Sequence, residues 1–171
     1  LFKRMLAIEE KRLGAEHPTI AATLSNLASL HLSQGRYGEA EALFKRSLFM
    51  RERLLGPEHV DVGLSLHNLA ALYQAESRYG EAEPLYKRSL AIGEATLGPD
   101  HPKVGKFLVN LAALYNAQGR RAEAEPLLKR SLAIAEKALG PDHSDVGRAL
   151  EGLAELYRSQ GRYAEAEPLL R

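Results

Sequence analysis

The chain has 171 residues without cysteine or tryptophan, and its 23 lysines and arginines nearly balance 22 aspartates and glutamates, which gives a formal charge of +1. The absence of cysteine excludes a disulfide framework and thiolate metal sites, and the balanced charge provides no electrostatic footprint for nucleic acid. No apolar run approaches the roughly 18 residues that span a bilayer, and no signal peptide opens the chain. We therefore expect no nucleic-acid or membrane partner, and a cytoplasmic protein.

A pattern that recurs every 42 residues organises the chain. Four sets of equivalent residues show it: Asn26, Asn68 and Asn110; Ala28, Ala70, Ala112 and Ala154; Ala40, Ala82, Ala124 and Ala166; and Gly14, Gly56, Gly98 and Gly140. A fixed period of this length is typical of arrays of helical hairpins, which bind other proteins. The sequence thus predicts an all-α fold built of antiparallel helix pairs.

The repeats can be placed along the chain from this alignment. Residues 1–14 align with the later part of a second helix, so they are expected to be a partial second helix of a preceding repeat. We expect repeats at residues 19–56, 61–98 and 103–140, and a truncated repeat at residues 145–171. Together they form one array over residues 1–171.

The first helix of each repeat has a clear apolar face. Leu66, Leu69, Ala70 and Tyr73 follow one another at i, i+3, i+4 and i+7, the spacing of one helical face. Leu72 adds a second apolar line, so we expect packing on two sides. The predicted first helices are Thr19–Gln34, Asp61–Glu76, Lys103–Gln118 and Asp145–Gln160.

A turn and a second helix follow in each repeat. Glycine at positions 35, 119 and 161 can adopt the positive φ that ends a helix, whereas Ser77 at the equivalent position predicts local strain. The predicted second helices are Gly38–Leu55, Gly80–Leu97 and Ala122–Leu139. Pro84, Pro126 and Pro168 conflict with a helix interior, so we expect each proline at a helix boundary.

One histidine per repeat follows the Leu-Gly-Pro connector or its counterpart: His17, His59, His101 and His143. Neighbouring repeats are separated by at least a helix diameter, about 10 Å, whereas zinc ligands lie about 2 Å from the ion. A shared metal site is therefore geometrically excluded. We predict a structural role, with the imidazole bonded to the loop backbone, and we expect no metal or cofactor.

The charged residues also follow the repeat. Glu83 and Lys87, like Glu125 and Lys129, form i,i+4 pairs in the favourable order, which indicates a solvated outer face. The sequence contains no glycine-rich phosphate loop, no Gly-x-Ser-x-Gly and no His-Glu-x-x-His motif. Its paired carboxylates recur in every repeat and are spaced two residues apart, so they point to different sides of a helix. We expect a protein that is not an enzyme.

The motifs Asn-Leu-Ala-x-Leu-Tyr, Glu-Ala-Glu-Pro-Leu and Leu-Gly-Pro-Asp-His resemble tetratricopeptide repeats, in the long form found in kinesin light chains and their bacterial relatives. The resemblance covers the whole chain. It implies a right-handed superhelical solenoid of helix pairs, whose first helices line a concave groove that holds an extended peptide. Members of this family are interaction scaffolds joined to many different domains.

The resemblance also implies which residues face the groove. Asn26, Asn68 and Asn110 match an asparagine ladder that contacts ligand backbone, since an amide offers both a donor and an acceptor. The alternative is that these side chains bond across the hairpin or to one another. Gly152 breaks the ladder in the fourth repeat. The remaining predicted partner-binding residues are Ser25, Ser29, Leu64, His67, Lys106, Val109, Asn116, Arg148 and Glu151.

Two further functions remain open at this stage. The first is a head-to-tail self-association, in which residues 1–14 of one copy complete the helix that ends at Arg171 of another; such contacts do not close and produce filaments. The apolar residues Leu1, Phe2, Leu169 and Leu170 motivate it. The second is a regulatory or sensor module within a larger multidomain protein.

Overall fold

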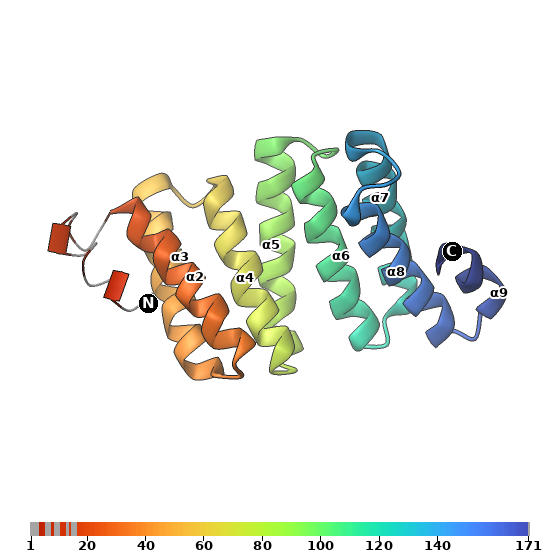
Figure 1. The fold of residues 1–171 in the computed structure, drawn as a ribbon, viewed down its shortest axis with the longest axis horizontal. Coiled ribbons are helices and arrows are strands. Elements are labelled where there is room, and N and C mark those ends of the chain that lie inside the picture. The colour runs from red at the N-terminus through yellow and green to blue at the C-terminus, as the bar shows by residue number, and fades with distance from the viewer. Residues whose placement is uncertain (1–3, 6–7, 9–10, 13, 15–16, 171) are drawn as a thin grey trace. The chain divides into compact units, whose positions relative to one another are not determined.

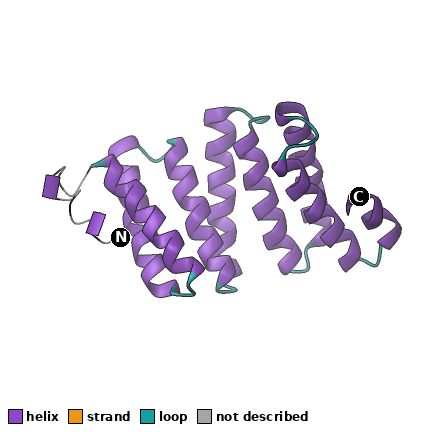
Figure 2. Ribbon diagram, in the orientation of Figure 1, coloured by secondary structure: helices purple, strands orange, loops and turns teal. Residues whose placement is uncertain are grey.

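The computed structural model describes residues 4–5, 8, 11–12, 14 and 17–170. In this part of the chain every regular element is helical and no strand occurs (Figures 1 and 2). The helices from residue 17 onward are α2 Pro18–Ser33, α3 Tyr37–Leu55, α4 Val60–Ala75, α5 Tyr79–Leu97, α6 Pro102–Ala117, α7 Arg121–Leu139, α8 Ser144–Ser159, α9 Tyr163–Ala166 and the short 3₁₀ helix η1 Glu167–Leu170. The predicted all-α fold is confirmed, and the first and second helices begin within one residue of their predicted positions.

The chain forms two compact units, residues 1–92 and residues 93–171, whose boundary lies within α5. In the N-terminal unit α2 packs against α3, and α3 packs against α4. In the C-terminal unit the same pattern recurs, because α6 packs against α7 and α7 against α8. The predicted half-helix at residues 1–14, and the self-association contacts of Leu1 and Phe2, fall largely outside the described residues.

The apolar face of the first helix is buried as its spacing predicts. In α4, Leu66, Leu69, Ala70 and Tyr73 are all buried, and Leu72 is fully buried on the second apolar line. Between α2 and α3, Ile20 and Leu24 cluster with Met50. Each such helix is therefore held on two sides, which is what a stack of hairpins requires.

The four histidines cap the helices that follow them. The Nδ1 atom of His59 accepts a hydrogen bond of 3.1 Å from the backbone N–H of Asp61, which lies in the first turn of α4. His17, His101 and His143 accept the equivalent bonds at the starts of α2, α6 and α8. The predicted structural role is confirmed, and the bonded backbone belongs to the helix rather than to the loop. The bond satisfies one of the backbone donors that a helix start leaves unpaired.

Two of the three prolines do not lie where the sequence predicts, whereas Pro168 is the second residue of η1, directly after α9 ends. Pro84 lies inside α5 and Pro126 inside α7, beyond the first turn of each helix. A proline at such a position removes one backbone donor, so the carbonyl four residues earlier loses its helical partner. Those carbonyls belong to Gly80 and Ala122, which are both exposed. Water can therefore satisfy them, which explains why the helix continues through the proline.

Ion pairs between the second helix of one repeat and the turn of the next hold neighbouring repeats together. Glu41 of α3 pairs with Arg78, which lies just before α5, at 3.0 Å, and with Lys45 at 2.7 Å. These two cations, Arg78 foremost, lower the pKa of Glu41 from its ordinary value of 4.5 to about 2. In the C-terminal unit Glu125 pairs in the same way with Lys129 and Arg162, and its pKa is also lowered to about 2.

Candidate partner-binding face

In the N-terminal unit the candidate face is formed by the neighbouring first helices α2 and α4. Asn26, Ser29 and Leu64 are exposed on it, and Asn68 is half-buried. The Ser29 hydroxyl donates a 3.0 Å hydrogen bond to the Ser25 carbonyl, so it is held by its own helix. This face offers a partner the Asn26 amide, the Leu64 side chain and part of the Asn68 amide.

Two residues predicted for this face lie elsewhere. Ser25 is buried against α3, where its hydroxyl lies 2.8 Å from that of Ser47. His67 is also buried, and its ring meets the ring of Tyr86 edge-on with 5.2 Å between centroids. Ser25 packs against the second helix α3 and His67 against the second helix α5, so neither side chain is exposed on the candidate face.

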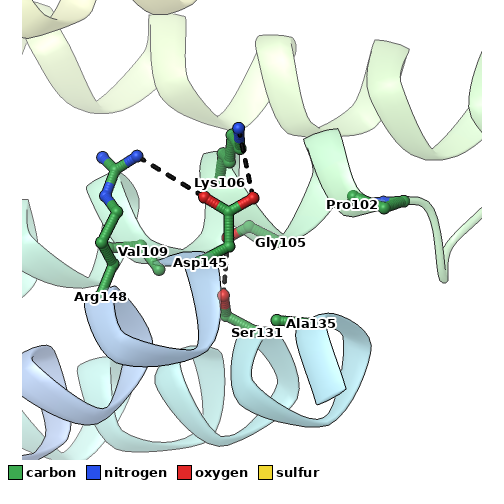
Figure 3. A pocket seen from close by; sticks show the side chains of 8 residues that line it. All are labelled: Pro102, Gly105, Lys106, Val109, Ser131, Ala135, Asp145 and Arg148. Carbon is green, nitrogen blue, oxygen red and sulfur yellow. Dashed lines mark hydrogen bonds and ion pairs between the residues drawn. The ribbon is translucent and has the colours of Figure 1, made fainter. Parts of the chain in front are cut away.

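In the C-terminal unit the candidate face is formed by α6 and α8, and it carries more charge. The carboxylate of Asp145 lies between Lys106, at 3.2 Å, and Arg148, at 3.9 Å (Figure 3). Asp145 is only 11% exposed, whereas both cations are exposed. One half-buried carboxylate thus holds two basic side chains at the surface, each with donors left for a ligand. The predicted residue Glu151 is exposed on the same helix as Arg148.

Asp145 is absent from the predicted site residues. The sequence does contain the signal, because an aspartate two positions after a capping histidine occurs both at Asp61 and at Asp145. What the repeat pattern does not reveal is that Lys106 of the preceding repeat reaches this carboxylate.

A pocket with about 240 Å³ of empty space lies beside this ion-pair group (Figure 3). Pro102, Gly105, Lys106 and Val109 of α6 form one wall, and Arg148 and Asp145 of α8 form another. Its floor belongs to α7: the hydroxyl of Ser131 donates a 2.8 Å hydrogen bond to the Gly105 carbonyl and fixes the two helices closely together. The pocket is therefore a shallow site with basic groups at its edge.

A second pocket, with about 300 Å³ of empty space, adjoins the first through Val109. Its lining residues are Val109, Ala112, Ala113, Asn116, Leu128, Gly152 and Glu155. Of the predicted site residues, Lys106, Val109, Asn116 and Arg148 thus line one pocket or the other. Asn110 is half-buried and lines neither of the two.

Neither pocket has the features of a metal centre. Within the described residues no three histidine, cysteine, aspartate or glutamate side chains come together as potential metal ligands. A search of the described helices finds none with the length and apolarity needed to cross a membrane. The α6/α8 face combines apolar lining residues, an amide and paired charges. Such a surface can recognise another molecule through direct contacts.

Comparison with known proteins identifies the family. The tetratricopeptide repeat model matches four overlapping segments, residues 1–53, 19–95, 61–112 and 104–171, which together span the chain. The chain belongs to the tetratricopeptide repeat family. Repeats of this family generally mediate protein–protein interactions. No curated protein matches the sequence significantly.

Several solved structures share the fold of this chain. A Podosopora anserina chain classed as a kinesin light chain, with nearly identical TPR-like repeats, is 32% identical with a TM-score of 0.79, and the match covers 99% of this chain and 80% of that one. BtubC (BKLC) from P. vanneervenii has a TM-score of 0.84 at 22% identity, with 99% of this chain and 67% of that one covered. Aspartyl phosphate phosphatase F from Bacillus subtilis has a TM-score of 0.76 at 14% identity, covering 89% and 38%. The last two likenesses concern the fold alone.

Proposed function

We propose that the chain binds an extended segment of a partner protein along the exposed faces of its first helices. The observation that carries this proposal is the pair of adjoining pockets on the α6/α8 face, which meet at Val109. Adjoining pockets on one face suit every second side chain of an extended peptide, because successive side chains of such a segment point to opposite sides. The family's general role in protein–protein interaction supports the same function.

The polar groups on these faces suit a peptide main chain. Asn26, which is exposed, and Asn68, which is half-buried, each carry an amide that can donate to a carbonyl and accept from an N–H group. A peptide bond presents both, whatever its side chain, so this recognition is independent of sequence. Side-chain selectivity then falls to the two pockets and to Lys106 and Arg148 at their edge.

The test is a screen of immobilised peptides followed by titration of the best binder. We expect Asn68→Ala, Asn110→Ala and Val109→Asp each to weaken binding, since they remove main-chain contacts or place a charge between the pockets. Glu136→Ala, at an exposed position of the second helix α7, is the matched control and should bind as the parent does. Unchanged affinity in all three variants would show that the peptide binds elsewhere.

A further inference from the structure

The second pocket can be understood by comparing two successive repeats. In the second repeat Tyr86 is buried, and its hydroxyl donates a 2.9 Å hydrogen bond to the Oε1 atom of Gln74. The ring thus fills the space between the helices, and its polar tip satisfies an amide on the neighbouring first helix. Phe44 fills the equivalent space in the first repeat and is also buried.

One period later the same two positions hold Leu128 and Asn116. Leucine has neither the ring nor the hydroxyl of Tyr86, and the amide it faces is retained. The Oδ1 atom of Asn116 is buried, and it has no hydrogen-bond partner among the described residues. A buried acceptor without a partner is unfavourable. The third repeat therefore lacks a hydrogen bond that the second repeat makes between its own two helices.

A second departure from the repeat lies directly opposite. Gly152 stands where the earlier repeats have the ladder asparagine, and a Cβ atom there would lie 2.7 Å from the Cδ2 atom of Leu128. The Leu128 side chain therefore packs directly against Gly152, and both residues line the pocket of about 300 Å³ together with Asn116. Both departures from the repeat, Leu128 and Gly152, thus lie in the lining of one pocket.

The residues that line this pocket differ between its base and its rim. Ala112 and Leu128 are buried and form an apolar base, whereas Ala113 and Glu155 are exposed and form the rim. The unpaired oxygen of Asn116 lies within this lining. An occupant must therefore be largely apolar, must carry a hydrogen-bond donor, and must tolerate a carboxylate at the entrance.

We propose that this pocket accepts the side chain of a tyrosine from the bound partner segment, with its hydroxyl bonded to Asn116. The ring lies in the pocket against Leu128 and Gly152, and the hydroxyl makes the bond to Asn116 that Gln74 receives from Tyr86 in the preceding repeat. A hydroxyl both donates and accepts, so it satisfies the Asn116 amide in either orientation. This inference rests on the proposed peptide-binding function and names one residue of the ligand.

The same chemistry excludes a phosphorylated tyrosine. A phosphotyrosine carries a charge of about −1.5 to −2 and three acceptor oxygens. At the tip of the ring that charge would lose its water in a largely apolar enclosure, and the group would pass the carboxylate of Glu155 on entry. Phosphorylation of the partner tyrosine is therefore expected to release it from this pocket.

The experiment uses three small probes and the whole chain labelled with ¹⁵N. The probes are the N-acetyl amides of tyrosine, phenylalanine and phosphotyrosine, and binding is followed by chemical-shift changes at the Gly152 backbone amide and the Asn116 side-chain amide. We expect tyrosine amide to bind roughly tenfold more tightly than phenylalanine amide, the worth of one net hydrogen bond. We expect phosphotyrosine amide to leave both signals unchanged.

Two variants locate the effect. Leu128→Tyr restores the ring found at Tyr86 and should abolish the shifts, because it fills the pocket and bonds Asn116 internally. Asn116→Ala should reduce the tyrosine-to-phenylalanine ratio to about one. Gln74→Ala is the matched control, since it removes the equivalent amide where Tyr86 already occupies the space, and it should leave the ratio unchanged. If Leu128→Tyr does not fold, the Asn116→Ala and Gln74→Ala comparison decides alone.

Two results would overturn the inference: equal binding of tyrosine and phenylalanine amides by the parent chain, or an undiminished preference for tyrosine in Asn116→Ala. Failure of the wider proposal has a different signature. If peptides from the screen bind with no preference for tyrosine, the subsite is refuted and the peptide-binding face stands. If the probes bind as expected and no peptide binds to the first-helix faces, the tyrosine pocket stands and the peptide-binding face is refuted.

Discussion

The hydroxyl of Tyr73 donates a 2.9 Å hydrogen bond to the Oε1 atom of Glu41, and so joins the first helix of one repeat to the second helix of the repeat before it. Tyr157 makes the same bond to Glu125 in the C-terminal unit, at 3.2 Å. In both places an arginine guanidinium, Arg78 or Arg162, lies over the tyrosine ring at about 4 Å from its centroid. The tyrosine is therefore both a hydrogen-bond donor to the junction and a platform for its cation.

Tyr73→Phe tests the hydrogen bond without disturbing the stacking. The phenylalanine ring keeps the contact with Arg78, and Glu41 keeps its two cations, so only one bond is lost. We expect the free energy of unfolding in urea to fall by about 0.5–1.5 kcal/mol. Tyr163→Phe is the control, because Tyr163 is 68% exposed and loses no buried contact. Equal stability of the two variants would mean that the Tyr73 bond contributes nothing.

The lowered pKa of Glu41 predicts a dependence of stability on pH. The pKa is about 2 in the folded chain, below the ordinary 4.5 of an unfolded carboxyl, because Arg78 and Lys45 stabilise the charged form. The contribution of Glu41 is therefore complete above about pH 5 and is lost as the pH falls toward 2. Glu41→Gln should cost about 1–2 kcal/mol at pH 7 and progressively less between pH 5 and pH 2.

Urea unfolding of the parent and of Glu41→Gln across this range measures that difference. Glu58→Gln, at an exposed connector position, is the matched control, and its effect should stay small throughout. A cost of Glu41→Gln that stays constant from pH 7 to pH 2.5 would refute the assignment.

The histidine cap of α4 predicts which substitutions the connector tolerates. His59→Ala removes the acceptor for the Asp61 N–H group and should lower the free energy of unfolding by about 1 kcal/mol. His59→Asn supplies a side-chain oxygen of suitable reach and should restore most of the loss. Thermal unfolding followed by circular dichroism distinguishes the two variants. If asparagine is as destabilising as alanine, the ring packing rather than the cap is what matters at this position.

Ser77 predicts a simple stabilising change. Its φ is +59°, whereas glycine occupies the equivalent positions 35, 119 and 161 with φ between +71° and +75°. A residue with a Cβ atom pays about 1 kcal/mol for this conformation, so Ser77→Gly should raise the free energy of unfolding by about that amount. The reciprocal change Gly119→Ser should lower it similarly. A destabilised Ser77→Gly variant would show that the hydroxyl has a role that outweighs the strain.

The helices themselves follow from the sequence because their signals are local. The spacing of Leu66, Leu69 and Tyr73 defines the buried face of a helix, and the glycine after each second helix defines its end, so both could be placed within a residue or two. The histidine role could also be predicted, since repetition once per repeat is incompatible with a single metal site.

Other features depend on what each residue meets across space. The helix continues through Pro84 where Gly80, the residue whose carbonyl loses its partner, is exposed, and that exposure is not visible in the spacing of residues. Ser25 and His67 share a broad helical face with the ladder asparagines, yet the neighbouring second helix covers them. The pocket beside Asn116 required two separate departures, at Leu128 and Gly152, to coincide in one place, and only the packed helices bring them together.

The junction made by Glu41, Tyr73 and Arg78 has a consequence for how such a gene can change length. Every 42-residue block supplies a carboxylate for the block after it and, with the exception of His31 at the tyrosine position, a tyrosine and an arginine for the block before it. Duplicating or deleting one whole block would therefore recreate the same set of junction residues between the two repeats that become neighbours, without any compensating mutation. Duplication of whole blocks can therefore lengthen the array while the contacts at every junction are preserved.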